Sequence, residues 1–238
     1  MNINLIGAFS NEWGAEYHVL SALNELGHKV TIFDHRRGKT INAINSLADL
    51  SLVLKGDGIS PDLIKALPKP TVLWYGELIH QSPETADEVS TQKAKELSYN
   101  LTAFDIIFHH DYTALDTIKA MGAKHVFWVS NSGVNPIFHR KLDIPKLYDV
   151  GFIGTPSARR IAILSYLHDK GINIIFSQVF GKEFNLFINQ CKIFLNMHYS
   201  ELLNTETRLH EILGAGTFAL SEIVSMPDMY LDRQHLVY

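Results

Sequence analysis

Short apolar runs alternate with helical patterns along the chain, and this alternation constrains the fold more than any other feature. Between the apolar runs, residues such as Val19, Leu20 and Leu23 fall on one face of a helix. Strands joined through helices need right-handed crossovers, which make them parallel neighbours in a sheet buried on both faces. The chain is therefore predicted to be an α/β protein. The expected strands are 3–8, 29–34, 50–55, 71–75, 104–109, 126–130, 149–154, 172–176, 192–197 and 217–221, and the clearest expected helices are 12–26, 113–121, 157–170 and 183–190.

The alternation is interrupted once, at residues 131–148, where prolines, a glycine and several charges replace the apolar periodicity. We interpret this segment as a linker between two Rossmann-like, doubly wound domains, 1–130 and 149–238, that face a cleft. The second domain is expected to be small or truncated. Its uncovered sheet would suit a protein partner or a second copy of the chain.

The composition is that of an ordinary globular protein and excludes several functional classes. The formal net charge of -4 at pH 7 provides no basic field for a nucleic-acid backbone. The single cysteine, Cys191, excludes an internal disulfide or a cysteine zinc cluster and favours a buried thiol. No apolar run is long enough to span a bilayer and the first residues lack a signal-peptide pattern, so we expect a cytoplasmic protein.

The segment from Arg208 to Glu222 contains the strongest candidate for a ligand site. It has the pattern of a short helix that opens with polar groups, ends on Gly214 and Gly216, and continues into an apolar strand. Arg208 and Glu211 are three residues apart and share a helical face. A guanidinium binds phosphate oxygens and a carboxylate accepts hydrogen bonds from a ribose diol, which together indicate a nucleotide-sugar site. An ion pair on a solvated helix is the alternative.

A second candidate is the glycine turn at Gly154 and Thr155, which follows a strand and precedes a helix. The backbone N–H groups and the dipole at a helix start favour an anion. Arg159 and Arg160 fall in the first helical turn, where their charges oppose the dipole unless an anion lies nearby. A capped helix with two solvated arginines is the alternative.

Asn196 ends the expected strand at 192–197. Ligands of open α/β sheets lie beyond the carboxyl ends of the strands. Because Gly154, Asn196 and the helix of Arg208 all follow such ends, we expect their side chains to converge on one site in the second domain.

Three polar residues that follow strands of the first domain are candidates for a general base toward an acceptor hydroxyl: His80, Glu77 and Asp111. Each could equally be a polar residue without a catalytic role. His109 and His110 are adjacent on a strand and point to opposite faces, so they do not indicate a metal site. No bound metal is expected.

The first strand-to-helix turn, between Gly7 and Gly14, lacks the G-x-G-x-x-G spacing of a dinucleotide fingerprint, although Asp34 stands where its ribose-binding acid would be. A nicotinamide oxidoreductase would require NAD to bind at this turn. A non-catalytic nucleotide-sugar-binding or assembly protein is a further alternative, because the small second domain leaves its sheet uncovered.

Several runs in the second half together resemble the second domain of GT-B glycosyltransferases, and are most similar to the spore-maturation-type (CgeB-like) branch. These runs are Tyr148-Asp-Val-Gly-Phe-Ile-Gly154 with Arg159, Lys192-Ile-Phe-Leu-Asn196, and Arg208-x-x-Glu211-x-x-x-x-Gly216. The segment 129–138 is similar to the family's interdomain piece.

This resemblance implies metal-independent transfer of a sugar from a nucleotide-sugar donor, bound in the second domain, to an acceptor in the first, without a cofactor. Glu211 matches the carboxylate at the donor ribose, Arg208 the cation near its phosphates, and Gly154 with Thr155 the glycine turn beside it. The other residues of these runs that the resemblance assigns to donor binding are Arg159, Lys192, Asn196 and Gly216. Many retaining members carry a second glutamate eight residues earlier, where this chain has Leu203. The stereochemical outcome stays open, as does the acceptor, which could be a glycan, a protein, a lipid or a modified base.

Overall fold

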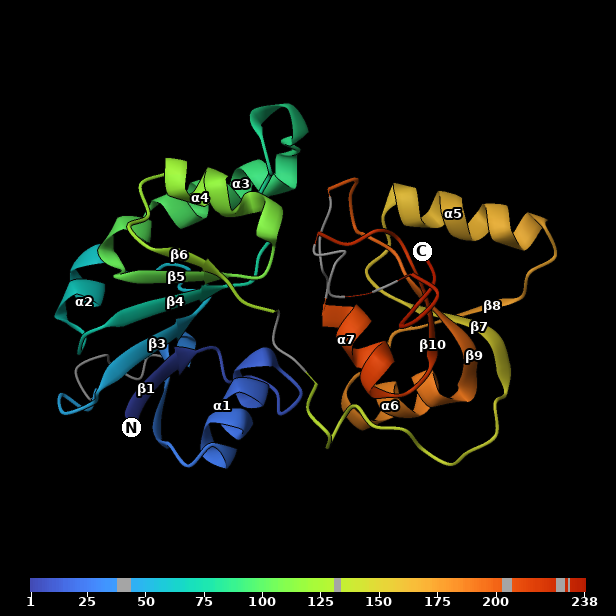
Figure 1. The fold of residues 1–238 in the computed structure, drawn as a ribbon, viewed down its shortest axis with the longest axis horizontal. Coiled ribbons are helices and arrows are strands. Elements are labelled where there is room, and N and C mark those ends of the chain that lie inside the picture. Colours follow the sequence, from blue (N-terminus) through green and yellow to red (C-terminus); the bar gives the residue numbers. More distant parts are fainter. Residues whose placement is uncertain (38–43, 131–133, 203–206, 226–229, 231) are drawn as a thin grey trace. The chain divides into compact units, whose positions relative to one another are not determined.

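A computed structural model describes residues 1–37, 44–130, 134–202, 207–225, 230 and 232–238. The chain forms two compact units, Met1–Ser132 and Gly133–Tyr238. Each unit is an α/β structure in its own right (Figure 1). The position of Leu203, where retaining enzymes carry a glutamate, lies outside the described residues.

The described part of the first unit contains six parallel strands in the order β2-β1-β3-β4-β5-β6. Because β2 and β3 flank β1 on opposite sides, the chain winds in two directions and covers both faces with helices. Val19 of α1 packs into the core on one face, and Ile64 of α2 and Ile118 of α4 into the core on the other (Figure 1). The elements are β1 (Asn2–Gly7), α1 (Ala15–Glu25), β2 (Lys29–Asp34), β3 (Leu50–Leu54), α2 (Pro61–Ala66), β4 (Thr71–Tyr75), α3 (Glu88–Ser98), β5 (Ile106–His109), α4 (Leu115–Ala120) and β6 (Val126–Trp128).

The described part of the second unit contains four parallel strands in the order β10-β9-β7-β8. Helix α5 covers one face of this sheet, and α6 and α7 cover the other (Figure 1). Val237 forms an isolated parallel β-bridge with Leu220 of the edge strand β10. The elements are β7 (Tyr148–Ile153), α5 (Ala158–Asp169), β8 (Ile174–Ser177), α6 (Gly181–Gln190), β9 (Cys191–Asn196), α7 (Thr207–Gly214) and β10 (Phe218–Ser221).

Every expected strand is present, with ends shifted by a few residues at most. Helix α3 was not expected, because its sequence carries few apolar residues and only Ser90 and Leu97 are buried. A capping box starts it: Asp87 accepts the N–H of Ser90, and Ser90 accepts the N–H of Asp87. Cys191 is buried, as expected, and burial raises the pKa of its thiol to about 11.

Residues 134–147, expected to be part of a linker, belong to the second unit. The side-chain oxygens of Asn185 and Asn189, one turn apart on α6, accept the backbone N–H groups of Arg140 and Leu142 at 3.0 and 2.8 Å. The amide of Asn189 also donates to the carbonyl of Arg140. These bonds fix an extended segment without apolar periodicity, which explains why the pattern alone indicated a linker.

Candidate functional site

The carboxyl ends of β7, β9 and β10 meet at one edge of the second sheet, which we call the carboxyl edge. Side chains alternate between the two faces along each strand. In β9, Leu195 belongs to the core beneath α5 and Phe194 to the core beneath α6 and α7. Asn196 therefore lies on the α6/α7 face, with Phe194. Its side-chain amide donates to Ser221 Oγ on β10 at 2.8 Å.

Arg208 and Glu211 are the second and fifth residues of α7, which begins at the carboxyl edge because it connects two parallel strands. Arg208 Nη1 lies 2.9 Å from Glu211 Oε2, and these side chains are only 22% and 16% exposed. The second oxygen, Glu211 Oε1, lies 3.4 Å from His139 Nε2. The pair is therefore held in a half-buried network and is not a solvated surface pair.

His139 presents its Nε2 atom to the carboxylate of Glu211. Its Nδ1 atom accepts the backbone N–H of Asn135 at 3.3 Å, so in the neutral ring the proton sits on Nε2, the atom that lies 3.4 Å from Glu211 Oε1. The His139 side chain is 3% exposed and its ring packs edge-on against Phe184. The guanidinium of Arg208 lies over the same ring, 4.2 Å from its centre. Phe184 thus fixes both partners of Glu211.

The glycine turn lies on the other face of the sheet, beneath α5. A Cβ atom at Gly154 would lie 2.9 Å from both Phe152 and the guanidinium of Arg160. Arg160 is buried and donates to the backbone carbonyls of Thr155, Met197 and His198. It therefore joins the loops after β7 and β9 and is not a solvated arginine. The side chain of Thr155 is exposed, and the N-cap of α5 is Ser157.

Arg159 forms a two-point ion pair with Glu222, the residue after β10. Burial raises the pKa of the Glu222 carboxyl, but hydrogen bonds from Arg159 and from the backbone N–H of His198 lower it by more. The net pKa lies below its ordinary value, and the pKa of Arg159 is raised by the same contact. The positive charge of Arg159 is thus balanced within the protein.

Two expected donor-binding residues, Lys192 and Gly216, lie at the opposite, amino edge of the sheet. Lys192 is the second residue of β9 and pairs with Asp149 at 2.7 Å on the surface. Gly216 precedes β10, and its positive φ of 67° ends α7. The structure does not bring these residues to Arg208, because strand direction places them at the other end of the sheet.

The three candidate bases in the first unit have different surroundings. Asp111 is buried and accepts hydrogen bonds from Thr113 and Gln81, which fits a structural cap. Glu77 pairs with Lys55 at 2.7 Å. The Nδ1 atom of His80 is buried without a hydrogen-bond partner among the described residues. Of the three candidates, Glu77 and Asp111 hold partners through their carboxylates, whereas this nitrogen of His80 holds none in the described part of the chain.

The turn after β1 carries a carboxylate where a dinucleotide would place its pyrophosphate. Glu16 Oε1 accepts the backbone N–H of Ala8 at 3.4 Å, and its side chain fills the space beside Gly7. A buried carboxylate repels an anion and uses the N–H group that would bind it. This arrangement disfavours NAD binding at the turn.

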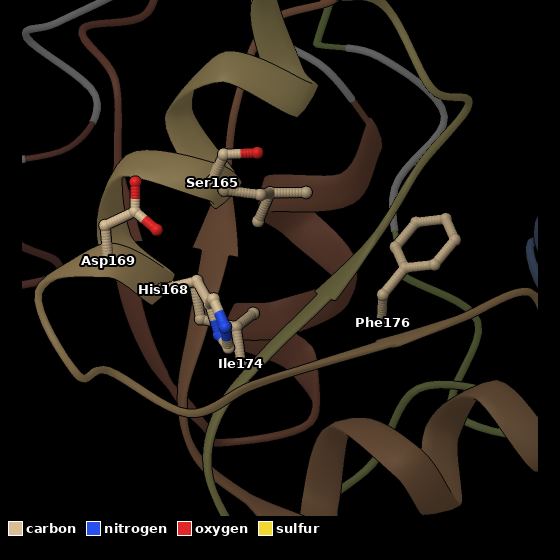
Figure 2. Close-up of a pocket in the computed structure, with 6 residues that line it drawn as sticks. Ser165, His168, Asp169, Ile174 and Phe176 are labelled. Carbon is tan, nitrogen blue, oxygen red and sulfur yellow. The ribbon is translucent and has the colours of Figure 1, made fainter.

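A pocket of ≈ 310 Å³ lies between the end of α5 and the start of β8, at the amino edge of the second sheet (Figure 2). His168 and Ile174 line it together with Phe176. Neither Ser165 nor Asp169 points toward the His168 ring in Figure 2, so the three polar side chains do not form a catalytic array. The pocket is remote from the carboxyl edge.

Sequence reasoning missed His139 and Phe184. His139 lies in a segment without periodicity, and Phe184 belongs to the apolar face of α6. One signal in the sequence was the spacing of Asn185 and Asn189, which lie one turn apart on the expected helix. The structure buries both side chains, and buried amides need hydrogen-bond partners such as the backbone of a neighbouring segment. Among the described residues, no three His, Cys, Asp or Glu side chains are grouped so as to hold a metal ion. None of the described helices has the length and apolar character needed to cross a membrane.

No protein-family model matches the chain. Among similar proteins are two from Acanthamoeba polyphaga mimivirus. "Uncharacterized protein L140" is 39% identical over 100 residues, which cover 39% of this chain and 32% of that protein. "Uncharacterized protein R358" is 43% identical over 61 residues, which cover 25% of this chain and 21% of that protein. The matched part is thus at most about a third of each relative's length.

A solved structure shares the fold of this chain. Sucrose-phosphate synthase from Thermosynechococcus elongatus superposes with a TM-score of 0.61 over 97% of this chain and 84% of that chain, at 10% sequence identity. At this identity the likeness concerns the fold alone. The expected fold class is confirmed: the chain has a GT-B-like α/β fold built from two Rossmann-like units with parallel sheets.

Proposed function

We propose that the second unit binds a nucleotide sugar and that the chain transfers the sugar to an acceptor hydroxyl. The observation that carries the proposal is the network of Arg208, Glu211 and His139 at the carboxyl edge of a GT-B-like fold. The motif residues also favour kinship with the spore-maturation-type branch. The acceptor is a glycan, a protein, a lipid or a modified base.

The network suits the two polar parts of a nucleoside diphosphate. A carboxylate has about four lone-pair positions, so Glu211 can accept ribose hydroxyls while Arg208 and His139 each hold one oxygen. The guanidinium of Arg208 is the group that would meet the phosphate oxygens, because a guanidinium can bind two of them at once. As the bond to the sugar breaks, this positive charge would stabilise the departing diphosphate.

In the transfer step, the acceptor oxygen forms a bond to the anomeric carbon and the diphosphate leaves with the bonding electron pair. The proton of the acceptor hydroxyl passes to a base. We propose His80, which follows β4 in the first unit, for this role. Glu77 and Asp111 are alternatives that already hold partners.

A non-catalytic nucleotide-sugar-binding protein is the second candidate, and one observation favours it. Arg159 is committed to Glu222, and Arg160 to three backbone carbonyls. The glycine turn therefore offers a departing diphosphate less free positive charge than the sequence indicates. Such a protein would bind nucleotide without turning it over.

Calorimetry with UDP and GDP tests the proposal. Arg208→Ala and Glu211→Ala should each weaken binding of the preferred nucleotide about tenfold, because each removes a charge-assisted hydrogen bond. Lys192→Ala is the matched control, since it removes a surface ion pair at the amino edge. Equal binding by all variants would show that the site is misplaced. Turnover of a panel of nucleotide sugars separates the enzyme from the binder.

A further inference from the structure

Strand β8 lies at one edge of the second sheet, beside α5 (Figure 1). Its backbone pairs with β7 on one side, and no described segment forms a backbone hydrogen bond with it on the other side. Such an edge presents a row of N–H and C=O groups to any further strand, and proteins usually protect it with charged residues, proline or a bulge. β8 has neither a charge nor a proline, and its register with β7 is unbroken.

The sequence around β8 carries no charged residue from Gly171 to Gly181. Each end of this stretch is followed outward by one acidic and one basic residue, so neither end carries a net charge. By contrast, β2, an edge strand of the first sheet, begins with Lys29 and ends with Asp34. Like charges directly opposite each other destabilise a strand pair. Two copies of β8 can therefore approach each other without charge repulsion.

Apolar side chains line this edge on the face that α5 covers. Phe176 is 44% exposed, and Ile174, two residues earlier in β8, lies on the same face. Together with Leu164 of α5 they line the pocket of ≈ 310 Å³ (Figure 2). A cavity of about 150 Å³ can hold a benzene ring, so this pocket has room for an aromatic side chain. Ile161, one turn before Leu164 on α5, is a further exposed apolar residue.

We propose that two copies of the chain associate through β8, with the two strands antiparallel about a two-fold axis. This symmetry makes the two halves of the contact equivalent and closes the assembly at two copies. The register that keeps apolar residues opposite one another places Ile175 beside its own copy and Ile174 beside Phe176 of the other copy. Each Phe176 then fills the pocket of the other copy, and the two sheets become continuous. This assembly does not depend on nucleotide binding.

Sedimentation velocity of the full chain over a range of concentrations tests the proposal. The parent should sediment with twice the mass of one chain, which is 26.9 kDa. Phe176→Lys should weaken the association at least about a hundredfold, because the symmetry places the added charge in both halves of the contact, away from water. Ile32→Lys is the matched control, since Ile32 is a 41% exposed apolar residue of the edge strand β2. It should sediment as the parent does.

A pair of introduced cysteines tests the register, whether or not Phe176→Lys folds. In the proposed register Asn173 lies opposite Ser177 of the other copy, at a Cα separation of about 4.5–5.5 Å that a disulfide can span. The double variant Asn173→Cys/Ser177→Cys should therefore form a covalent dimer on mild oxidation, whereas Asn173→Cys alone should not. The native Cys191 is buried and does not compete. Non-reducing gel electrophoresis measures the product.

Three results would overturn the proposal. The first is a parent that stays monomeric at every concentration up to its solubility limit. The second is a dimer that a folded Phe176→Lys variant leaves intact or that Ile32→Lys dissociates, because the interface would then lie away from β8. The third is failure of the cysteine double variant to form a covalent dimer, or equal cross-linking by Asn173→Cys alone, which would exclude the antiparallel register.

Discussion

At the scale of single residues, the properties of Glu211 come from groups distant in the sequence. Its position on α7 supplies Arg208 as a neighbour, but His139 and Phe184 come from other segments and decide its orientation. A carboxylate held at both oxygens is pre-organised, so less conformational entropy is lost when a ligand binds.

His139 is therefore expected to be a positioning residue for nucleotide binding. His139→Ala should weaken binding of the preferred nucleoside diphosphate about fivefold, because Glu211 Oε1 loses its donor. His139→Gln should recover part of the loss, since its amide N–H can replace the Nε2–H group. Calorimetry checks both. Equal affinities for the parent and the two variants would contradict the role.

Glu222 should add a pH-dependent contribution to stability. Its pKa in the folded protein lies below the ordinary value of 4.5, so the contribution is complete above about pH 4.5 and is lost as the pH falls through the folded pKa. The free energy of unfolding of the parent minus that of Glu222→Gln should be constant near neutral pH and shrink below about pH 4.5. Urea unfolding measures it. A difference that grows on acidification would contradict the assignment.

At the scale of elements, strand direction decides which residues share an edge. Helix α7 begins at the carboxyl edge with Thr207 and ends at the amino edge with Gly214, two residues before Gly216. Two backbone hydrogen bonds cap its end. The N–H of Gly216 donates to the carbonyl of Leu213, and the N–H of Thr217 donates to the carbonyl of Ile212. These bonds assign Gly216 to helix termination, because its φ of 67° is one that L-residues rarely adopt.

Gly216→Ala should lower the free energy of unfolding by about 1 kcal/mol, the cost of a left-handed conformation for a residue with a Cβ atom. Nucleoside diphosphate affinity should not change, because Gly216 lies at the amino edge. Chemical denaturation and calorimetry measure the two effects. A loss of affinity without a loss of stability would return Gly216 to the binding site.

At the scale of the whole molecule, the two units differ in what they offer a nucleotide. The second unit presents Arg208 and the glycine turn at its carboxyl edge, whereas the turn after β1 in the first is occupied by Glu16. Ligand binding stabilises the part of a protein that makes the contacts.

Saturation with the preferred nucleoside diphosphate should therefore slow amide hydrogen exchange in the second unit, most of all in α7 and the segment near His139. At a ligand concentration of 100 times Kd, the stabilisation should reach about 2.7 kcal/mol. Hydrogen–deuterium exchange with mass spectrometry measures it by segment. Protection confined to residues 7–16 would instead support a dinucleotide at the first turn.

The local pattern predicted most of the secondary structure, because strand and helix periodicities depend on neighbouring residues. It also identified Arg208 and Glu211 as neighbours, since three residues span about one helical turn. It missed α3, because this helix buries little apolar surface and is started by a capping box. The family resemblance, and not the local pattern, placed Lys192 and Gly216 in the site. Their positions, at or just before the start of a strand, already indicate the amino edge.

The sequence by itself determined the fold class, because alternating buried strands and amphipathic helices have few other solutions than a doubly wound parallel sheet. Only the tertiary structure decided which charged side chains pair with one another. Arg159 and Glu222 form an ion pair although they are 63 residues apart in the sequence. His139 contacts Glu211 because a hydrogen bond from α6 holds the backbone of the next residue, Arg140. Such contacts depend on how distant segments pack together in three dimensions, and local periodicity does not encode that packing.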